Sequence, residues 1–291
     1  MATQAEKGAT FRALHQRKGA FLIPNPWDVG TARLLQMMGF EALATTSGGF
    51  AFSIGKPDGA VDGETMLKHA AALAAATDLP VSADLEAGYA DEPKRVAETV
   101  RRAASAGLAG CSIEDVGAHG AKPYELAFAA GRVRAAAEAA HALAFPFMLT
   151  ARAENYIVGR PDLADTIARL QAFQEAGADV LFAPGLKTKQ EIQTLVRAVD
   201  RPVNVIMGLQ GVQLTLAELS ELGVKRVSVG SSLSRAALGA FLKAAREMQE
   251  QGTFTFADDA VKYAELNAKF GAGRTGIGKS KSRSLGQGAP S

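Results

Sequence analysis

The chain contains very little cysteine, and this limits how it can be held together. Cys111 is the only cysteine among 291 residues, so an internal disulfide is excluded. It lies inside an apolar segment, where we expect a buried, unreactive thiol rather than a nucleophile. This cysteine usage is typical of the reducing cytoplasm, and we predict a cytoplasmic protein.

Long apolar runs and a strong net charge are also absent. No stretch reaches the roughly 18 apolar residues that span a bilayer, and residues 1–18 lack the apolar core of a signal peptide. The formal net charge is only +2. Residues 271–291 contain no acid and four basic residues: Arg274, Lys279, Lys281 and Arg283. We therefore predict no membrane association, no dedicated nucleic-acid surface, and a flexible basic tail over 271–291.

Motifs that hold nucleotides or zinc are missing as well. The glycine-rich phosphate loops of the Rossmann and Walker types do not occur. The four histidines are scattered without the spacing of zinc ligands: His15, His69, His119 and His141. The sequence therefore gives no support to a nucleotide cofactor or a zinc site.

Eight short apolar segments are present and alternate with helical stretches. They cover residues 20–24, 42–47, 80–84, 110–114, 146–151, 178–183, 202–207 and 224–230. Segments this short and this apolar are typical of parallel strands buried on both faces. The clearest helical stretches are 92–106, 124–143, 161–176 and 187–199. The alternation predicts a (β/α)8 TIM barrel, and we expect residues 1–270 to form one catalytic domain that includes a C-terminal helix.

Acidic residues stand where two neighbouring strands end. Asp84 and Glu86 follow the third strand, and Glu114 closes the fourth. Three carboxylates at one barrel mouth repel, so either their pKa values rise or a cation neutralises them. Mg²⁺ is favoured because it prefers oxygen ligands and binds through few protein carboxylates. The alternative is that these acids pair with Arg95 or Arg152 at the rim.

Six short phrases resemble those of the isocitrate lyase / phosphoenolpyruvate mutase superfamily. They are Asn25-Pro26-Trp27-Asp28, Thr46-Ser47-Gly48-Gly49, Asp58-Gly59, Asp84-Leu85-Glu86-Ala87-Gly88-Tyr89, Ser112-Ile113-Glu114-Asp115 and Thr150-Ala151-Arg152-Ala153-Glu154. The similarity runs over roughly residues 11–270, with the phrases in the family's order. It implies a barrel of the phosphoenolpyruvate/pyruvate type and assembly as a homotetramer. Residues 254–270 resemble the family's C-terminal helix, which the resemblance implies is swapped between subunits.

The resemblance also implies a metal site. Asp84 would bind Mg²⁺ directly, with Mn²⁺ as a substitute, and Glu86 and Glu114 would reach the ion through water. A small 2-oxo or 2-hydroxy carboxylate would bind to the ion, which would stabilise a pyruvate-type enolate. Asp58 would orient a metal-bound water or transfer a proton.

Substrate contacts follow from the same resemblance. Backbone N–H groups of Ser47, Gly48 and Gly49 would hold a carboxylate or enolate oxygen, because small residues let the backbone approach closely. Arg152 would clamp a carboxylate with its planar fork, unless it only forms a rim ion pair with Glu154.

The chain departs from the lyases of this superfamily that act on isocitrate and methylisocitrate. Those enzymes carry a cysteine on the loop after the fourth strand, and residues 116–123 contain none. This glycine-rich loop is a candidate lid, with His119 as acid and Lys122 as charge clamp; an ordinary surface loop is the alternative. After the seventh strand, residues 206–209 replace a Thr-Glu-Phe-Gly phrase, although Asn204 could still face the substrate.

These features favour a Mg²⁺-dependent lyase that decarboxylates an oxaloacetate-like acid or cleaves a malate-like carbon–carbon bond. One alternative is phosphorus–carbon chemistry on phosphonopyruvate, for which Lys122 offers a partial match. The other alternative is a protein that binds 2-oxo acids with little turnover.

Overall fold

The computed structural model describes residues 2–117, 120, 122–209 and 211–271. The chain divides into two units, Met1–Lys243 and Ala244–Ser291. The first unit holds the strands and the predicted site residues. The two units are described one after the other.

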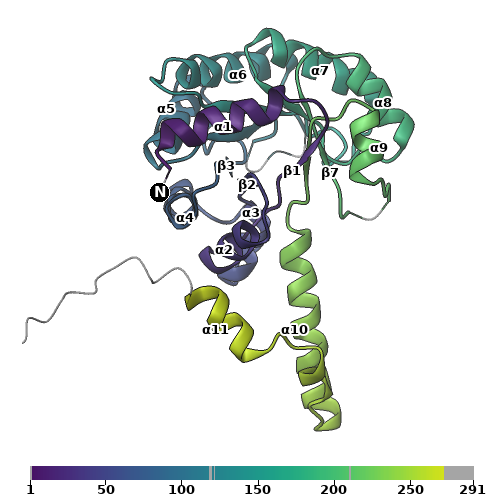
Figure 1. Cartoon of the computed structure of the whole chain (residues 1–291). Helices are drawn as coiled ribbons and strands as arrows, with labels where there is room; N and C mark the ends of the chain where they lie inside the picture. Colours follow the sequence, from purple (N-terminus) through teal and green to yellow (C-terminus); the bar gives the residue numbers. More distant parts are fainter. Residues whose placement is uncertain (1, 118–119, 121, 210, 272–291) are drawn as a thin grey trace, which may run out of the picture. The chain divides into compact units, whose positions relative to one another are not determined.

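The first unit is built around eight parallel strands (Figure 1). They are β1 Phe21–Leu22, β2 Leu43–Ala44, β3 Val81–Asp84, β4 Gly110–Glu114, β5 Met148–Arg152, β6 Val180–Phe182, β7 Val203–Ile206 and β8 Arg226–Ser228. Each strand from β2 to β8 pairs with the next, and β8 pairs with β1. The N–H of Ala44 donates to the carbonyl of Pro24 at 3.1 Å, which joins β2 to the end of β1. The predicted (β/α)8 barrel is confirmed.

Helices follow the strands and form the outer layer. They are α1 Gln4–Gln16, α2 Val29–Met37, α3 Ser47–Ser53, α4 Gly63–Ala76, α5 Pro93–Ser105, α6 Leu126–His141, α7 Leu163–Glu175, α8 Lys189–Arg197, α9 Leu216–Glu221 and α10 Ser232–Gln251, which continues into the second unit. Figure 1 shows α5 to α8 in sequence around the outside of the strands. The four predicted helical stretches are confirmed to within a few residues.

Seven of the eight strands are shorter than the predicted segments. At residues 42–47 the apolar character predicts a strand throughout, whereas β2 ends at Ala44 and Ser47 begins α3. The reason is local, because the side chain of Thr46 accepts the N–H of Gly49 and caps the helix. This capped turn brings the start of α3 to the carboxyl end of the barrel.

Helix α1 covers the amino ends of the strands. Its Phe11 and Leu14 cluster with Phe21 and Ile23, and all four are at most 5% exposed. Gly8 lies so close to β5 that an added Cβ would stand 2.2 Å from the carbonyl oxygen of Pro146. The barrel is therefore sealed at this end.

The interior also contains the lone cysteine. Cys111 on β4 is fully buried, and burial raises the pKa of its thiol. This confirms the expected buried, unreactive group.

The second unit contains the end of α10, a 3₁₀ turn at Thr255–Asp258 and α11 Tyr263–Gly271. Only the second half of the predicted 254–270 helix is α-helical. The first half is a 3₁₀ turn that ends at Asp259, whose N–H donates to the carbonyls of Phe256 and Ala257. The subunit swap, the homotetramer and the 1–270 domain limits stay predictions, and residues 272–291 of the tail lie outside the described residues. No helix in the described ranges has the length and apolar content to cross a membrane.

Candidate active site

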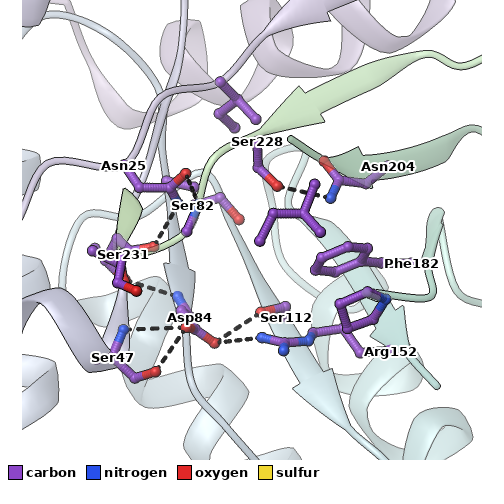
Figure 2. A pocket seen from close by; sticks show the side chains of 18 of the residues that line it. Asn25, Ser47, Ser82, Asp84, Ser112, Arg152, Phe182, Asn204, Ser228 and Ser231 are labelled. Carbon is purple, nitrogen blue, oxygen red and sulfur yellow. Dashed lines mark hydrogen bonds and ion pairs between the residues drawn. The ribbon is translucent and has the colours of Figure 1, made fainter. Parts of the chain in front are cut away.

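A pocket of about 250 Å³ opens at the carboxyl ends of the strands in the first unit. Alternate strand residues point into it, among them Ser82 and Asp84 on β3, Asn204 and Ile206 on β7, and Arg226 and Ser228 on β8. Figure 2 shows Ser47, Asp84 and Arg152 joined at one end and the Asn204–Ser228 pair at the other. The pocket lies where barrel enzymes place their chemistry.

Asp84 is the centre of the hydrogen bonding at the mouth. Its Oδ2 accepts from the backbone N–H of Ser47 at 3.1 Å and from the Ser47 hydroxyl at 3.0 Å. Its Oδ1 lies 3.0 Å from Nη1 of Arg152 and 3.5 Å from the Ser112 hydroxyl. The Asp84 N–H donates to Thr45 Oγ1 at 2.8 Å. These contacts fix the carboxylate between α3, β4 and β5.

Arg152 gathers three carboxylates around one guanidinium. Its Nη1 lies 2.9 Å from Oε1 of Glu114 and 3.0 Å from Asp84, and its Nε lies 2.9 Å from Oε1 of Glu154. Burial opposes the charge of Arg152, but Glu114 and Glu154 raise its pKa overall. The rim pairing considered from the sequence therefore exists for Arg152, whereas Arg95 lines a separate pocket.

The mouth carries more negative than positive charge. Besides the Arg152 partners, it contains Asp58 and Glu86. Burial, followed by the charge of Asp84, raises the pKa of Glu86 to about 7 and also raises that of Asp58. Burial likewise raises the pKa of Glu114. Oε1 of Glu86 is buried without a hydrogen-bond partner among the described residues. Formally, five carboxylates therefore stand around the guanidinium of Arg152 at the mouth: Asp58, Asp84, Glu86, Glu114 and Glu154.

The chemical type of these side chains suits a metal ion, but their positions in the structure do not form a ready-made metal site. In the described part of the chain, no three His, Cys, Asp or Glu side chains are grouped closely enough to hold an ion. Nη1 of Arg152 bridges Asp84 and Glu114 instead. The oxygen donors, the uncompensated charge and the unpartnered Glu86 oxygen suit a hard divalent cation. The ligand set Asp84, Glu86 and Glu114 stays a prediction.

Glu86 should make the metal-free protein less stable as pH rises. Its folded-state pKa of about 7 lies above the ordinary 4.5, so folding favours the protonated carboxyl. This stabilisation is complete below the unfolded-state pKa and is lost as pH rises through the folded-state pKa. We expect the Tm to fall between about pH 5 and about pH 8, and Glu86→Gln to flatten that fall. An unchanged slope in Glu86→Gln, with the exposed Glu98→Gln as control, would show that Glu86 is not responsible.

The start of α3 carries the predicted backbone donors. The N–H of Ser47 is engaged by Asp84, and the N–H of Gly49 donates to Thr46 Oγ1 at 3.2 Å. A Cβ on Gly48 would stand 2.9 Å from Oδ2 of Asp58. Glycine at this position lets the Asp58 carboxylate approach the start of α3. The substrate roles of residues 47–49 stay predictions.

Two of the remaining predicted residues can be placed. Asn204 is 1% exposed and lines the pocket, where its Nδ2 donates to Ser228 Oγ at 3.0 Å. Lys122 is exposed and lines the second pocket together with Glu86 and Tyr89. His119 lies outside the described residues. The structure therefore brings Ser47, Gly48, Asp58, Asp84, Arg152 and Asn204 to one pocket, and Glu86 and Lys122 to another. Glu114 lines neither pocket and joins the site through Arg152.

Sequence reasoning missed Arg132, which organises the site from α6. Its guanidinium donates to the carbonyls of Asp91 at 3.0 Å, Glu114 at 2.8 Å and Ala90 at 2.9 Å, and also to that of Ala87. It thereby ties the loop after β3 to the end of β4. In this loop Glu86 has a positive φ of 49°, which is uncommon for a residue other than glycine. The sequence did carry a signal for this role, because Arg132 interrupts the apolar face of an alanine-rich helix.

A pocket at the carboxyl end of a (β/α)8 barrel, lined by two acids and two arginines, has the position and polarity of a barrel enzyme's active site. Residues 11–249 match the family model described as phosphoenolpyruvate phosphomutase. The chain belongs to this family. Its predicted membership of the isocitrate lyase / phosphoenolpyruvate mutase superfamily is confirmed.

Individual relatives agree with this assignment. Protein Rv1998c of Mycobacterium tuberculosis H37Rv is 36% identical over 263 residues, covering 89% of this chain and 95% of its own. A solved structure from Burkholderia cenocepacia J2315, provisionally assigned as a lyase/mutase, is 60% identical with a TM-score of 0.91, covering 92% of this chain and 97% of its own. The 2,3-dimethylmalate lyase of Eubacterium barkeri is 28% identical over 229 residues, covering 74% of this chain and 76% of its own.

Proposed function

We propose that this chain is a Mg²⁺-dependent carbon–carbon lyase that forms a pyruvate-type enolate from a small 2-oxo or 2-hydroxy di- or tricarboxylate. The observation that carries the proposal is the excess of carboxylates around Asp84 and Arg152 at the barrel mouth. A divalent cation would neutralise that excess, and an anionic substrate would bring the carboxylate that the cation and Arg152 attract. The kinship with a dimethylmalate lyase supports the bond type.

In this proposal the site residues have separate roles. Asp84, Glu86 and Glu114 would hold Mg²⁺, which when bound supplies Lewis-acid stabilisation of enolate charge. Arg152 would orient a substrate carboxylate, because its fork is already held in place by Glu154. Asp58, whose pKa is raised by partial burial and by Asp84, lies next to Gly48 and would hold a proton at the pocket.

Phosphonate chemistry is the second candidate, favoured by the phosphomutase family match. It would draw on Lys122, which stands beside Glu86 at the second pocket. If phosphonopyruvate is the substrate, we expect Lys122→Ala to lower kcat/KM at least about 10-fold, because a charge-assisted contact is lost. The exposed Lys189→Ala serves as control. A Lys122→Ala variant with unchanged kcat/KM would remove Lys122 from this chemistry.

The deciding experiment is a product-release assay with Mg²⁺ on oxaloacetate, methylisocitrate, isocitrate, dimethylmalate and phosphonopyruvate, with Asp84→Ala as the blank. It follows pyruvate for every substrate, and in addition glyoxylate for isocitrate and phosphoenolpyruvate for phosphonopyruvate. Release from one carboxylate that disappears in the blank and with EDTA establishes the lyase. Release from phosphonopyruvate alone selects the alternative. Silence on all five substrates, with oxalate still binding in the presence of Mg²⁺, would overturn the lyase in favour of a binding role.

A further inference from the structure

Among the described residues, Arg226 is a buried cation without a counter-ion. It begins β8, is 5% exposed and lines the pocket. Its Nε donates to Asn204 Oδ1 at 2.8 Å and its Nη2 to Thr150 Oγ1 at 3.0 Å, and both acceptors are neutral. Its Nη1 is buried without a hydrogen-bond partner in the described ranges of the chain.

The surroundings of Arg226 increase its need for an anion. Burial, and then the positive charge of Arg152, lower the pKa of Arg226 to about 9, so it stays charged at neutral pH. The nearby His15 is neutral, since burial and Arg226 lower its pKa to about 3. An unpaired buried charge is strongly unfavourable. The other buried arginines have their partners: Arg132 donates to four carbonyls, and Arg169 pairs with Asp115 and Asp165. The partly buried Arg152 pairs with three carboxylates.

The pocket reaches down to Arg226. At this depth a TIM barrel is ordinarily filled by bulky branched side chains. Here several of the lining side chains are small and polar, namely Ser82, Ser112, Asn204 and Ser228, and they stand among apolar ones such as Ile23 and Ile206. Asp84 and Arg152 line the same pocket nearer the mouth. A ligand can therefore touch the carboxylate cluster and the buried arginine together.

We propose that Arg226 binds the distal carboxylate of a 2-oxo dicarboxylate whose 2-oxo acid end lies at Asp84 and Arg152. The inference rests on the proposed function and narrows its substrate class. Thr150, which accepts a hydrogen bond from Arg226, lies two residues before Arg152 on β5. Along the strand, the position of Thr150 is therefore about 6.6 Å from that of Arg152. The carboxylate carbons of a four- or five-carbon diacid are roughly 4–5 Å apart, and a hydrogen bond of about 2.9 Å completes the span. Oxalate and pyruvate carry no group that extends this far.

The test compares two ligands that differ only at the distal end. 2-Oxoglutarate carries a second carboxylate, and 2-oxopentanoate carries a methyl group in its place. Calorimetry on the full chain with Mg²⁺ should show 2-oxoglutarate binding at least about 10-fold more tightly, the size expected for a charge-assisted pair. Arg226→Met should erase that preference and leave oxalate affinity within about 2-fold. The exposed Arg201→Met should retain the preference.

The outcomes separate this inference from the proposed function. Oxalate binding without any preference for 2-oxoglutarate in the wild-type protein overturns the role of Arg226 and leaves the metal site standing. A preference that survives Arg226→Met overturns it as well. Failure of oxalate and both 2-oxo acids to bind with Mg²⁺ would count against the proposed function instead. If Arg226→Met does not fold, Arg226→Gln provides the same neutral replacement with an amide that can still reach Asn204.

Discussion

Asp84→Asn should reduce kcat/KM for pyruvate release by at least about 1,000-fold, the largest effect expected for a single change in this chain. The amide keeps the size of the carboxylate, so Ser47 and Thr45 can hold the backbone and side chain in place. It removes the negative charge to which both the cation and Arg152 are attracted. Steady-state kinetics and a Mg²⁺ titration should show the two losses together.

A matched control separates this effect from general damage. Asp200 is exposed and far from the pocket lining, so Asp200→Asn should keep wild-type kinetics. An Asp84→Asn protein that folds normally and keeps more than about a tenth of the activity would remove Asp84 from the metal site.

Arg152→Met should destabilise the metal-free protein by about 3–5 kcal/mol, the cost of leaving buried carboxylates without their cation. Asp84, Glu114 and Glu154 would remain near one another without the guanidinium that each of them contacts. Urea unfolding at neutral pH measures this loss. The loss should shrink at acid pH, where the three acids can be protonated.

Two additions make the Arg152 prediction specific. Arg152→Lys keeps the charge without the fork and should lose less stability than Arg152→Met. Mg²⁺ should restore part of the stability of Arg152→Met, because it replaces the missing positive charge. A loss below about 1 kcal/mol in Arg152→Met would show that the cluster does not depend on this guanidinium.

The barrel could be predicted because its signal is repeated. Each strand is a short apolar segment bounded by turn residues, so an error in one of them, such as the early end of β2 at Ala44, does not change the fold. The convergence of Asp84, Glu114 and Arg152 was also predictable, since parallel strands bring their carboxyl ends to one rim.

The partner choices at the rim could not be predicted in the same way. Arg152 had several acids within reach, and which of them it contacts depends on the stagger of strands around the closed barrel. Arg226 and Thr150 meet from β8 and β5 across the interior, 76 residues apart in sequence. Nothing local marks that contact, although a charged residue in an otherwise apolar strand signalled that the barrel interior is not uniformly apolar.

The seal formed by α1 has a kinetic consequence. With Phe11 and Leu14 closing the amino end, the pocket has its opening at the carboxyl ends of the strands. Two fragments made by bond cleavage must then depart through the same opening, and the deeper fragment waits for the outer one. We therefore expect ordered release, in which the fragment that leaves last acts as a competitive product inhibitor, whereas the first to leave does not.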